Sequence, residues 1–295
     1  MRCSICKQEG HNKKSCMATL KIKVKKNAIV GVVDTTTKTD NKKMDSAWMH
    51  ILTVIGYETH DEMIITAETM KNAKHSYTGA SNQFEPRLLA YHTSSKSRPT
   101  IFKEKGLYLL PLENGTYILQ KKNIYMDLNY SGPDPISIKK DDSSLVLNIG
   151  DSETSLIDNL RYSGVFERPE ILGEQITHGP LMNGRHRLNT TMTIGGVIRD
   201  VKSVQYETDS CYETKNKIII IEGKSALKEI DSFNIRQLYF PYRAIRDKVG
   251  DKKEIICAFI HKLGENIHIW LFDFINPTEF LSIREKAYYI YTFSL

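Results

Sequence analysis

Four consecutive isoleucines at positions 218–221 constrain the fold of this chain more than any other feature of its sequence. β-Branched side chains favour extended backbone, and a run without a polar position offers no face to water. Such a strand lies inside a sheet that is covered on both faces. Because further strands are expected at 189–209, 255–260 and 267–274, with helices between strands, the sequence predicts an α/β or α+β fold: a mixed central β-sheet flanked by helices.

Capping residues and turns predict where other elements begin and end. Thr66 opens a capping-box pattern, and Asn114-Gly115 lies between two apolar runs, as in a tight hairpin over 107–119. Pro241 is expected to interrupt a helix that begins at an Asp-Ser pair. A polar loop is expected at 35–43. Helices are expected at 45–56, with Asp45 as the cap, and at 66–73, 152–162, 168–175 and 231–240.

The first sixteen residues contain a pattern, C-x2-C-x4-H-x4-C, that is typical of a CCHC zinc knuckle. Three thiolates and one imidazole complete a tetrahedral shell around Zn²⁺ and leave no open position for catalysis, so the metal is expected to be structural. A segment this short has no core and would fold on the metal. Knuckles mostly bind nucleic acid. The predicted zinc ligands are Cys3, Cys6, His11 and Cys16.

Positive charge is concentrated at the start of the chain. Residues 1–26 hold eight Lys and Arg side chains and one Glu, a local charge of +7 in a chain of net charge +6. A field of this sign favours phosphate groups through counterion release. Because the knuckle has no aromatic residue for stacking on bases, Lys7, Lys13 and Lys14 are expected to contact phosphates.

Composition also bounds the compartment. The sequence shows no signal peptide and no apolar run of about eighteen residues, so a soluble, cytoplasmic protein without a membrane partner is expected. Cys211 and Cys257 lie in apolar or strand-like segments and are expected to remain reduced thiols.

The end of the isoleucine strand carries an acid and a base. Glu222 and Lys224 share one face of the strand, because side chains alternate with a period of two. A tight turn around Lys215-Asn216 would place Asp209 directly opposite Glu222, and Glu207 opposite Lys224. Two opposed carboxylates need a cation between them, and Mg²⁺ prefers such oxygen ligands. An ordinary hairpin with exposed salt bridges is the alternative interpretation.

These residues also predict a reaction. Asp209 and Glu222 would hold Mg²⁺ against a phosphate, and the metal would lower the pKa of a bound water. Lys224 would orient that water or stabilise the charge that develops in the transition state. The predicted chemistry is therefore hydrolysis of a phosphodiester bond.

Asp209, followed after twelve residues by Glu222-Gly223-Lys224, resembles the PD-(D/E)xK nuclease signature, with Thr208 where the pattern often has Pro. The segment FNIRQLYFPYR at 233–243 is similar to a helix that follows the catalytic strand in a group of type II restriction endonucleases. Stretches at 84–91, 107–119 and 183–187 also resemble that group. The resemblance implies a Mg²⁺-dependent, sequence-specific endonuclease that cuts double-stranded DNA, acts as a homodimer and has a cognate DNA methyltransferase in the same genome.

The resemblance also suggests further site residues. Gln237 is expected to reach the site from the helix after the catalytic strand, and Glu170 or Glu174 is a candidate for an additional acid on an upstream helix. Glu207 and Glu213 compete with Asp209 for the role of first carboxylate. The residues expected to contact DNA from this part of the chain are Arg185, Arg187, Arg236 and Arg243.

The expected organisation has three parts. A zinc knuckle occupies 1–20, a module that shares in DNA recognition occupies 21–140, and a restriction-endonuclease-like core occupies 141–295, with a boundary in the Pro-, Gly- and Asp-rich segment 129–142. Two other functions stay open: a zinc-knuckle nucleic-acid-binding protein without catalysis, and a PD-(D/E)xK nuclease of repair or RNA processing.

Overall fold

The computed structural model describes residues 38–57, 60–79, 84–141, 143–144, 152–182 and 184–294. The predicted zinc ligands Cys3, Cys6, His11 and Cys16, and the lysines Lys7, Lys13 and Lys14, lie outside these residues. The described part combines helices with three β-sheets in an α+β arrangement, as expected for the fold class. No helix within it is long and apolar enough to cross a membrane.

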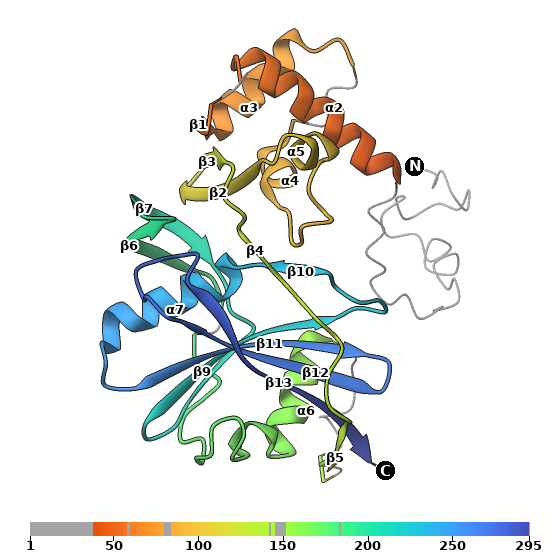
Figure 1. The fold of residues 1–295 in the computed structure, drawn as a ribbon, viewed down its shortest axis with the longest axis vertical. Coiled ribbons are helices and arrows are strands. Elements are labelled where there is room, and N and C mark those ends of the chain that lie inside the picture. Colours follow the sequence, from red (N-terminus) through yellow and green to blue (C-terminus); the bar gives the residue numbers. More distant parts are fainter. Residues whose placement is uncertain are drawn as a thin grey trace, which may run out of the picture. The chain divides into compact units, whose positions relative to one another are not determined.

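The largest sheet has six strands in the order β5-β13-β12-β11-β9-β8 (Figure 1). It is mixed, because β9 pairs with β11 and β5 with β13 in parallel, whereas the other neighbours are antiparallel. The segment expected as a domain boundary thus supplies an edge strand. The bounds are β5 Ile136–Lys139, β8 Ser210–Glu213, β9 Lys217–Ser225, β11 Glu254–Leu263, β12 Asn266–Phe274 and β13 Ile283–Ser294.

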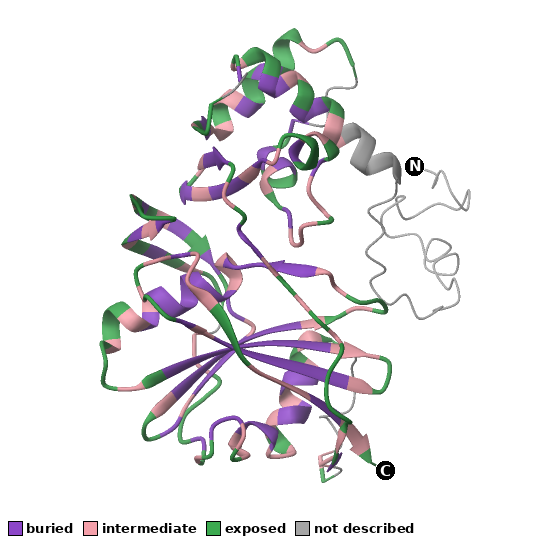
Figure 2. Cartoon of the chain, in the orientation of Figure 1, coloured by how far each residue is buried: buried purple, intermediate pink, exposed green. Residues whose placement is uncertain are grey.

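Strand β9 is covered on both faces, as the isoleucine run predicts. Ile219 and Ile221 pack in one cluster with apolar residues of α6 (Glu153–Tyr162), and Ile218 and Ile220 pack in another with residues of α7 (Arg236–Val249). All four isoleucines are at most 4% exposed, and Figure 2 shows the central strands β9, β11 and β12 as largely buried. The two helices thereby hold the end of β9 from opposite sides.

The helix expected at 231–240 is wrong in its bounds. Ser232–Asn234 forms β10, which pairs with β4 (Tyr125–Asp127), and α7 begins only at Arg236 and continues through Pro241. A proline inside a helix costs about 3 kcal/mol. The residues that follow Gln237 in α7 are mostly buried in the core, and each large apolar side chain contributes about 1.5–3 kcal/mol, which outweighs that cost.

A second sheet has five strands in the order β1-β3-β2-β7-β6. The hairpin predicted at Asn114-Gly115 joins β2 to β3, with Gly115 at φ +80°. Glu113 of β2 pairs with Lys202 of β7, so this sheet combines strands from both halves of the chain. The bounds are β1 Glu62–Thr66, β2 Tyr108–Glu113, β3 Thr116–Gln120, β6 His186–Ile194 and β7 Val197–Tyr206.

The remaining helices confirm some predicted bounds and correct others. Thr66 caps α3 by accepting a hydrogen bond from the N–H of Thr69, and Ser152 caps α6 in the same way. α2 begins at Lys38, within the loop expected at 35–43, so Asp45 lies inside the helix. The Asp45 carboxylate accepts a hydrogen bond from the N–H of Thr100. No helix forms at 168–175, where hydrogen bonds close turns instead. The bounds are α2 Lys38–Val54, α3 Ala67–Ala73, α4 Pro86–Ala90 and α5 Thr100–Glu104, with 3-10 turns at Lys74–Ser76 and Val165–Glu167.

Candidate active site

The β8–β9 hairpin has the register that its turn predicts, from Glu213 opposite Ile218 to Ser210 opposite Ile221. The ladder ends at Ser210, one residue after Asp209. The Asp209 carboxylate reaches β9 through its side chain, because Oδ2 accepts a hydrogen bond from the N–H of Gly223 at 2.8 Å. Asp209 is therefore anchored beside Glu222 although it is not part of the ladder.

Lys224 lies among three carboxylates. Its Nζ is 2.8 Å from Oε1 of Glu222, 3.4 Å from Oε1 of Glu153 and 4.0 Å from Oδ2 of Asp209. The same Nζ donates to the carbonyl oxygen of Gly223 at 2.7 Å. One ammonium thus offsets the charge of acids from α6, from the residue just before β8 and from β9.

Gln237 joins this group from the first turn of α7. Its Nε2 donates to Oε1 of Glu222. Its Oε1 is buried and has no hydrogen-bond partner within the described part of the chain. A buried amide oxygen without a partner costs about 1–3 kcal/mol, which makes it an acceptor that a water, a cation or a substrate group would satisfy.

The electrostatic state of the group follows from its burial. Glu222 is 7% exposed, and burial raises the pKa of its carboxyl to about 7, against the opposing effect of the Lys224 ammonium. Burial opposes the charged form of Lys224 as well, but Glu222, Glu153 and Asp209 together raise the pKa of its ammonium above the ordinary value. The site therefore holds a firmly charged lysine beside a carboxyl that titrates near neutral pH.

The donors fit a hard divalent cation such as Mg²⁺. Asp209 and Glu222 supply carboxylate oxygens, and the unpartnered Oε1 of Gln237 is a third oxygen of the type this ion prefers. Within the described ranges, no three His, Cys, Asp or Glu side chains form a group that could hold a metal alone. Mg²⁺ is usually bound by one or two carboxylates, with water and substrate phosphates as its other ligands.

Glu153 is the site residue that sequence reasoning missed. It is the first residue of α6, after the Ser152 cap, and the helix can approach β9 because position 223 is a glycine. A Cβ at Gly223 would lie 3.2 Å from Cδ1 of Ile157 and 3.7 Å from Cβ of Glu153. The glycine between the acid and the base is the signal from which a helix close to this strand could have been predicted.

The other predicted acids lie elsewhere. Glu207 does not oppose Lys224, because the ladder ends at Ser210; it pairs with Arg185 at 2.8 Å. Glu170 bonds to Arg168 and Tyr291. Glu174 and Glu213 lie at the turn end of the hairpin, where Glu174 bonds to Thr214 and Asn216, and Glu213 to Lys253. None of the four has an ion pair with Lys224.

The predicted DNA-contacting arginines have different surroundings. Arg185 is exposed in its pair with Glu207, and Arg187 donates to the carbonyl oxygen of Ser203. The guanidinium of Arg236 lies 5.8 Å from the ring centre of Tyr91. Arg243 is only 7% exposed, and its guanidinium binds Asp247, Thr190 and the carbonyl of Pro277, so it has little surface for DNA.

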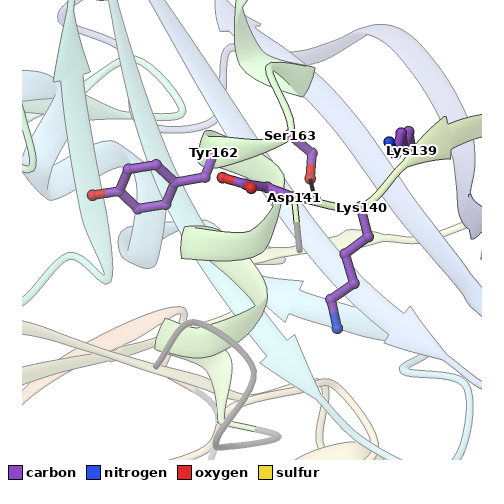
Figure 3. A pocket seen from close by; sticks show the side chains of 5 residues that line it. All are labelled: Lys139, Lys140, Asp141, Tyr162 and Ser163. Carbon is purple, nitrogen blue, oxygen red and sulfur yellow. Dashed lines mark hydrogen bonds between the residues drawn. The ribbon is translucent and has the colours of Figure 1, made fainter. Parts of the chain in front are cut away.

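A pocket of about 260 Å³ lies away from this group, where the end of β5 meets the end of α6. The N–H of Asp141 donates to Oγ of Ser163 there, and Tyr162 and Lys140 point in different directions (Figure 3). Its lining contains none of the predicted site residues. The lining residues are Lys139, Lys140, Asp141, Tyr162 and Ser163.

Two family models match the chain. One, described as Domain of unknown function (DUF6997), matches residues 120–292, and the other, described as Domain of unknown function (DUF6996), matches residues 45–119. No curated protein and no solved structure matches the chain.

Proposed function

Since the chain belongs to the DUF6997 family, whose description states no activity, we propose a function from its own residues. The protein is a Mg²⁺-dependent, sequence-specific endonuclease that hydrolyses phosphodiester bonds of double-stranded DNA. The observation that carries the proposal is the position of Lys224 among Glu222, Glu153 and Asp209 at the end of a buried strand. The PD-(D/E)xK resemblance of Asp209 and Glu222-Gly223-Lys224 agrees with this arrangement.

Each residue has a role in the proposed reaction. Asp209 and Glu222 hold the cation, which would polarise the scissile phosphate and lower the pKa of a bound water. Lys224 orients the attacking water and stabilises charge on the phosphate oxygens. Gln237 holds the carboxylate of Glu222 in place through its Nε2, and Glu153 positions the Lys224 ammonium. Glu153 is thus a positioning residue, and Gln237 combines the positioning of Glu222 with an Oε1 that would bind the cation.

The proposal includes partners and a second metal. Cys3, Cys6, His11 and Cys16 bind structural Zn²⁺, and Lys7, Lys13 and Lys14 hold DNA phosphates, which the spacing of the ligands and the local charge of +7 support. The enzyme acts as a homodimer, and as a restriction enzyme it requires a cognate DNA methyltransferase in the same genome.

Digestion of a sequenced plasmid by the full chain tests the proposal. With Mg²⁺ we expect discrete bands whose ends map to one short sequence, and we expect Lys224→Ala and Glu222→Gln to abolish them. Glu174→Gln, an acid at the other end of the hairpin, should cut as the wild type does. A smear would instead support a nuclease of repair or RNA processing. Binding without cutting in Mg²⁺ or Mn²⁺ would overturn the enzyme proposal in favour of a binding protein.

A further inference from the structure

Helix α4 and the start of α7 form an exposed surface of basic and apolar side chains. Leu88 is 66% and Tyr91 62% exposed, and Arg87 beside them is exposed as well. Arg236 adds a second guanidinium from α7, over the ring of Tyr91. We call Arg87, Leu88, Tyr91 and Arg236 the α4 patch.

The α4 patch adjoins the candidate active site along the chain. Residues that follow α4 run beside β10, because the N–H of Asn234 donates to the carbonyl of Thr93 at 3.2 Å and the N–H of Ser95 to Oγ of Ser232 at 2.8 Å. Strand β10 leads directly into α7. The guanidinium of Arg236 lies 5.8 Å from the ring centre of Tyr91, and the next residue, Gln237, binds Glu222.

The charge of the α4 patch is not offset by ion pairs. In the described ranges, neither Arg87 nor Arg236 forms an ion pair with a carboxylate. Both guanidiniums act on the same phenol, because burial raises the pKa of Tyr117 while Arg236 and Arg87 oppose that effect. Within the described residues, Arg87 on α4 and Arg236 over the ring of the exposed Tyr91 thus have no carboxylate partner.

We propose that the α4 patch binds the DNA backbone next to the scissile phosphate. Arg87 and Arg236 contact phosphate oxygens, and the exposed rings and methyl groups of Tyr91 and Leu88 pack against the adjacent sugar. Guanidiniums are suited to planar recognition of phosphate, and an aromatic face is suited to a nucleotide. The inference rests on the proposed function, because the α4 patch gains its role from the neighbouring Glu222 and Gln237.

Duplex DNA is the occupant that the charge favours. A protein partner for Leu88 and Tyr91 would bury two unpaired guanidiniums, which is costly without matching acids. DNA offers phosphates at regular spacing along the surface and releases counterions on binding. A protein partner would leave duplex binding insensitive to changes in the α4 patch.

Binding of a fluorescent 30-base-pair duplex to the full chain in EDTA tests the inference, since the absence of Mg²⁺ separates binding from cutting. We expect the double variant Arg87→Ala/Arg236→Ala to bind about tenfold more weakly, with a salt slope lower by about one for each contact removed. Tyr91→Ala should weaken binding, and Tyr91→Phe, which keeps the ring, should not.

The double variant Lys121→Ala/Arg284→Ala is the matched control. It removes the same net charge, but these side chains already pair with Asp61 and Asp273. Equal losses of duplex affinity in the two double variants would overturn the inference, and so would wild-type affinity of the Arg87→Ala/Arg236→Ala protein. Neither result would count against the nuclease, which the plasmid digestion tests separately. Loss of binding in a protein whose wild type does not cut would keep the α4 patch as a DNA site and reject the nuclease. A wild-type chain that binds no duplex would reject both.

Discussion

Glu and Lys side chains lie near both ends of β9, but the surroundings of the acids differ. At the turn end, Glu174 accepts hydrogen bonds from Oγ1 of Thr214 at 2.6 Å and from the N–H of Asn216 at 3.0 Å. At the other end, Glu222 is buried and depends on the side chains of Lys224 and Gln237. The turn end satisfies its acid with a hydroxyl and a backbone N–H, whereas the other end uses a charged ammonium and a side-chain amide.

The difference is visible in the direction of the pKa changes. Hydrogen bonds from Thr214 and Asn216 lower the pKa of Glu174 to about 2, whereas burial raises the pKa of Glu222 to about 7. An acid that holds a turn together is stabilised in its charged form. An acid that is kept charged at a cost is a better candidate for function. Glu174 and Glu222 are the same residue type and both lie near a lysine. The hydrogen-bond donors around each carboxylate distinguish the structural acid from the candidate functional one.

The largest expected effect is on catalysis. Lys224→Met should reduce the single-turnover rate of plasmid cleavage by about 10³-fold, because the ammonium acts on charge that develops in the transition state. Lys253→Met, which removes the lysine that pairs with Glu213 at 2.5 Å, should leave the rate within about threefold of the wild type. Similar losses of cleavage rate in Lys224→Met and Lys253→Met would show that the two ends of β9 do not differ in function.

The same pair of variants should differ in stability. Without divalent cations, Lys224→Met leaves Glu222, Glu153 and Asp209 with no cation and should lower the free energy of unfolding by about 3 kcal/mol. Lys253→Met breaks a more exposed ion pair and should cost about 1 kcal/mol or less. Urea unfolding at pH 8 measures both. Adding Glu222→Gln to Lys224→Met should restore part of the loss, and no restoration would argue against the buried carboxylate as its cause.

The pH dependence of stability should have opposite signs at the two ends. The fold raises the pKa of Glu222 from 4.5 to about 7. The stability that Glu222 contributes is therefore complete below about pH 4.5 and is lost as pH rises through 7. Glu222→Gln should therefore be more stable than the wild type at pH 8 by about 2 kcal/mol, and this difference should shrink at pH 5.

For Glu174, whose pKa falls to about 2, the contribution is present above about pH 4.5 and is lost as pH falls through 2. Glu174→Gln should thus be less stable than the wild type at pH 6, with a difference that shrinks in acid. Urea unfolding in EDTA at each pH measures the stability of both variants. If the difference from the wild type changed with pH in the same direction for Glu222→Gln and Glu174→Gln, the two ends of β9 would not differ as proposed.

The smallest expected effect is stabilisation by the cation. Mg²⁺ at ten times its dissociation constant should raise the free energy of unfolding by about 1.4 kcal/mol. Asp209→Asn should remove most of that gain, and Glu174→Gln should keep it, because only Asp209 lies among the proposed cation ligands. Thermal unfolding with and without Mg²⁺ measures this stabilisation. Equal stabilisation of Asp209→Asn and Glu174→Gln would show that the ion binds elsewhere.

The register of the hairpin was predictable because two local signals agree, although the ladder ends before Asp209. The Lys215-Asn216 turn sets the pairing, and the isoleucine run fixes burial on both faces, so Glu222 and Lys224 must share a face. Glu153 was not predictable in the same way, because its contact with Lys224 depends on how α6 packs over Gly223.

The predicted bounds of helices were wrong where tertiary packing overrode a local sequence rule. The Asp-Ser pair at 231 looked like a helix cap, yet Ser232 enters β10, since pairing with β4 satisfies its backbone. Asp45 looked like a cap as well, but its carboxylate is used by Thr100, far away in sequence. Pro241 was expected to end a helix, and the buried residues around it keep the helix intact.

The five-stranded sheet takes β1, β2 and β3 from before residue 121 and β6 and β7 from after residue 185. A chain divided in the segment 121–124 would leave β2 in one fragment and β7 in the other, each with an open edge of unpaired N–H and C=O groups. β2 and β7 pair at Glu113 and Lys202, so two fragments produced from separate genes are expected to reassemble at this junction. The protein is thereby suited to a split format, in which the five-stranded sheet, and with it the proposed activity, would form only in cells that make both halves.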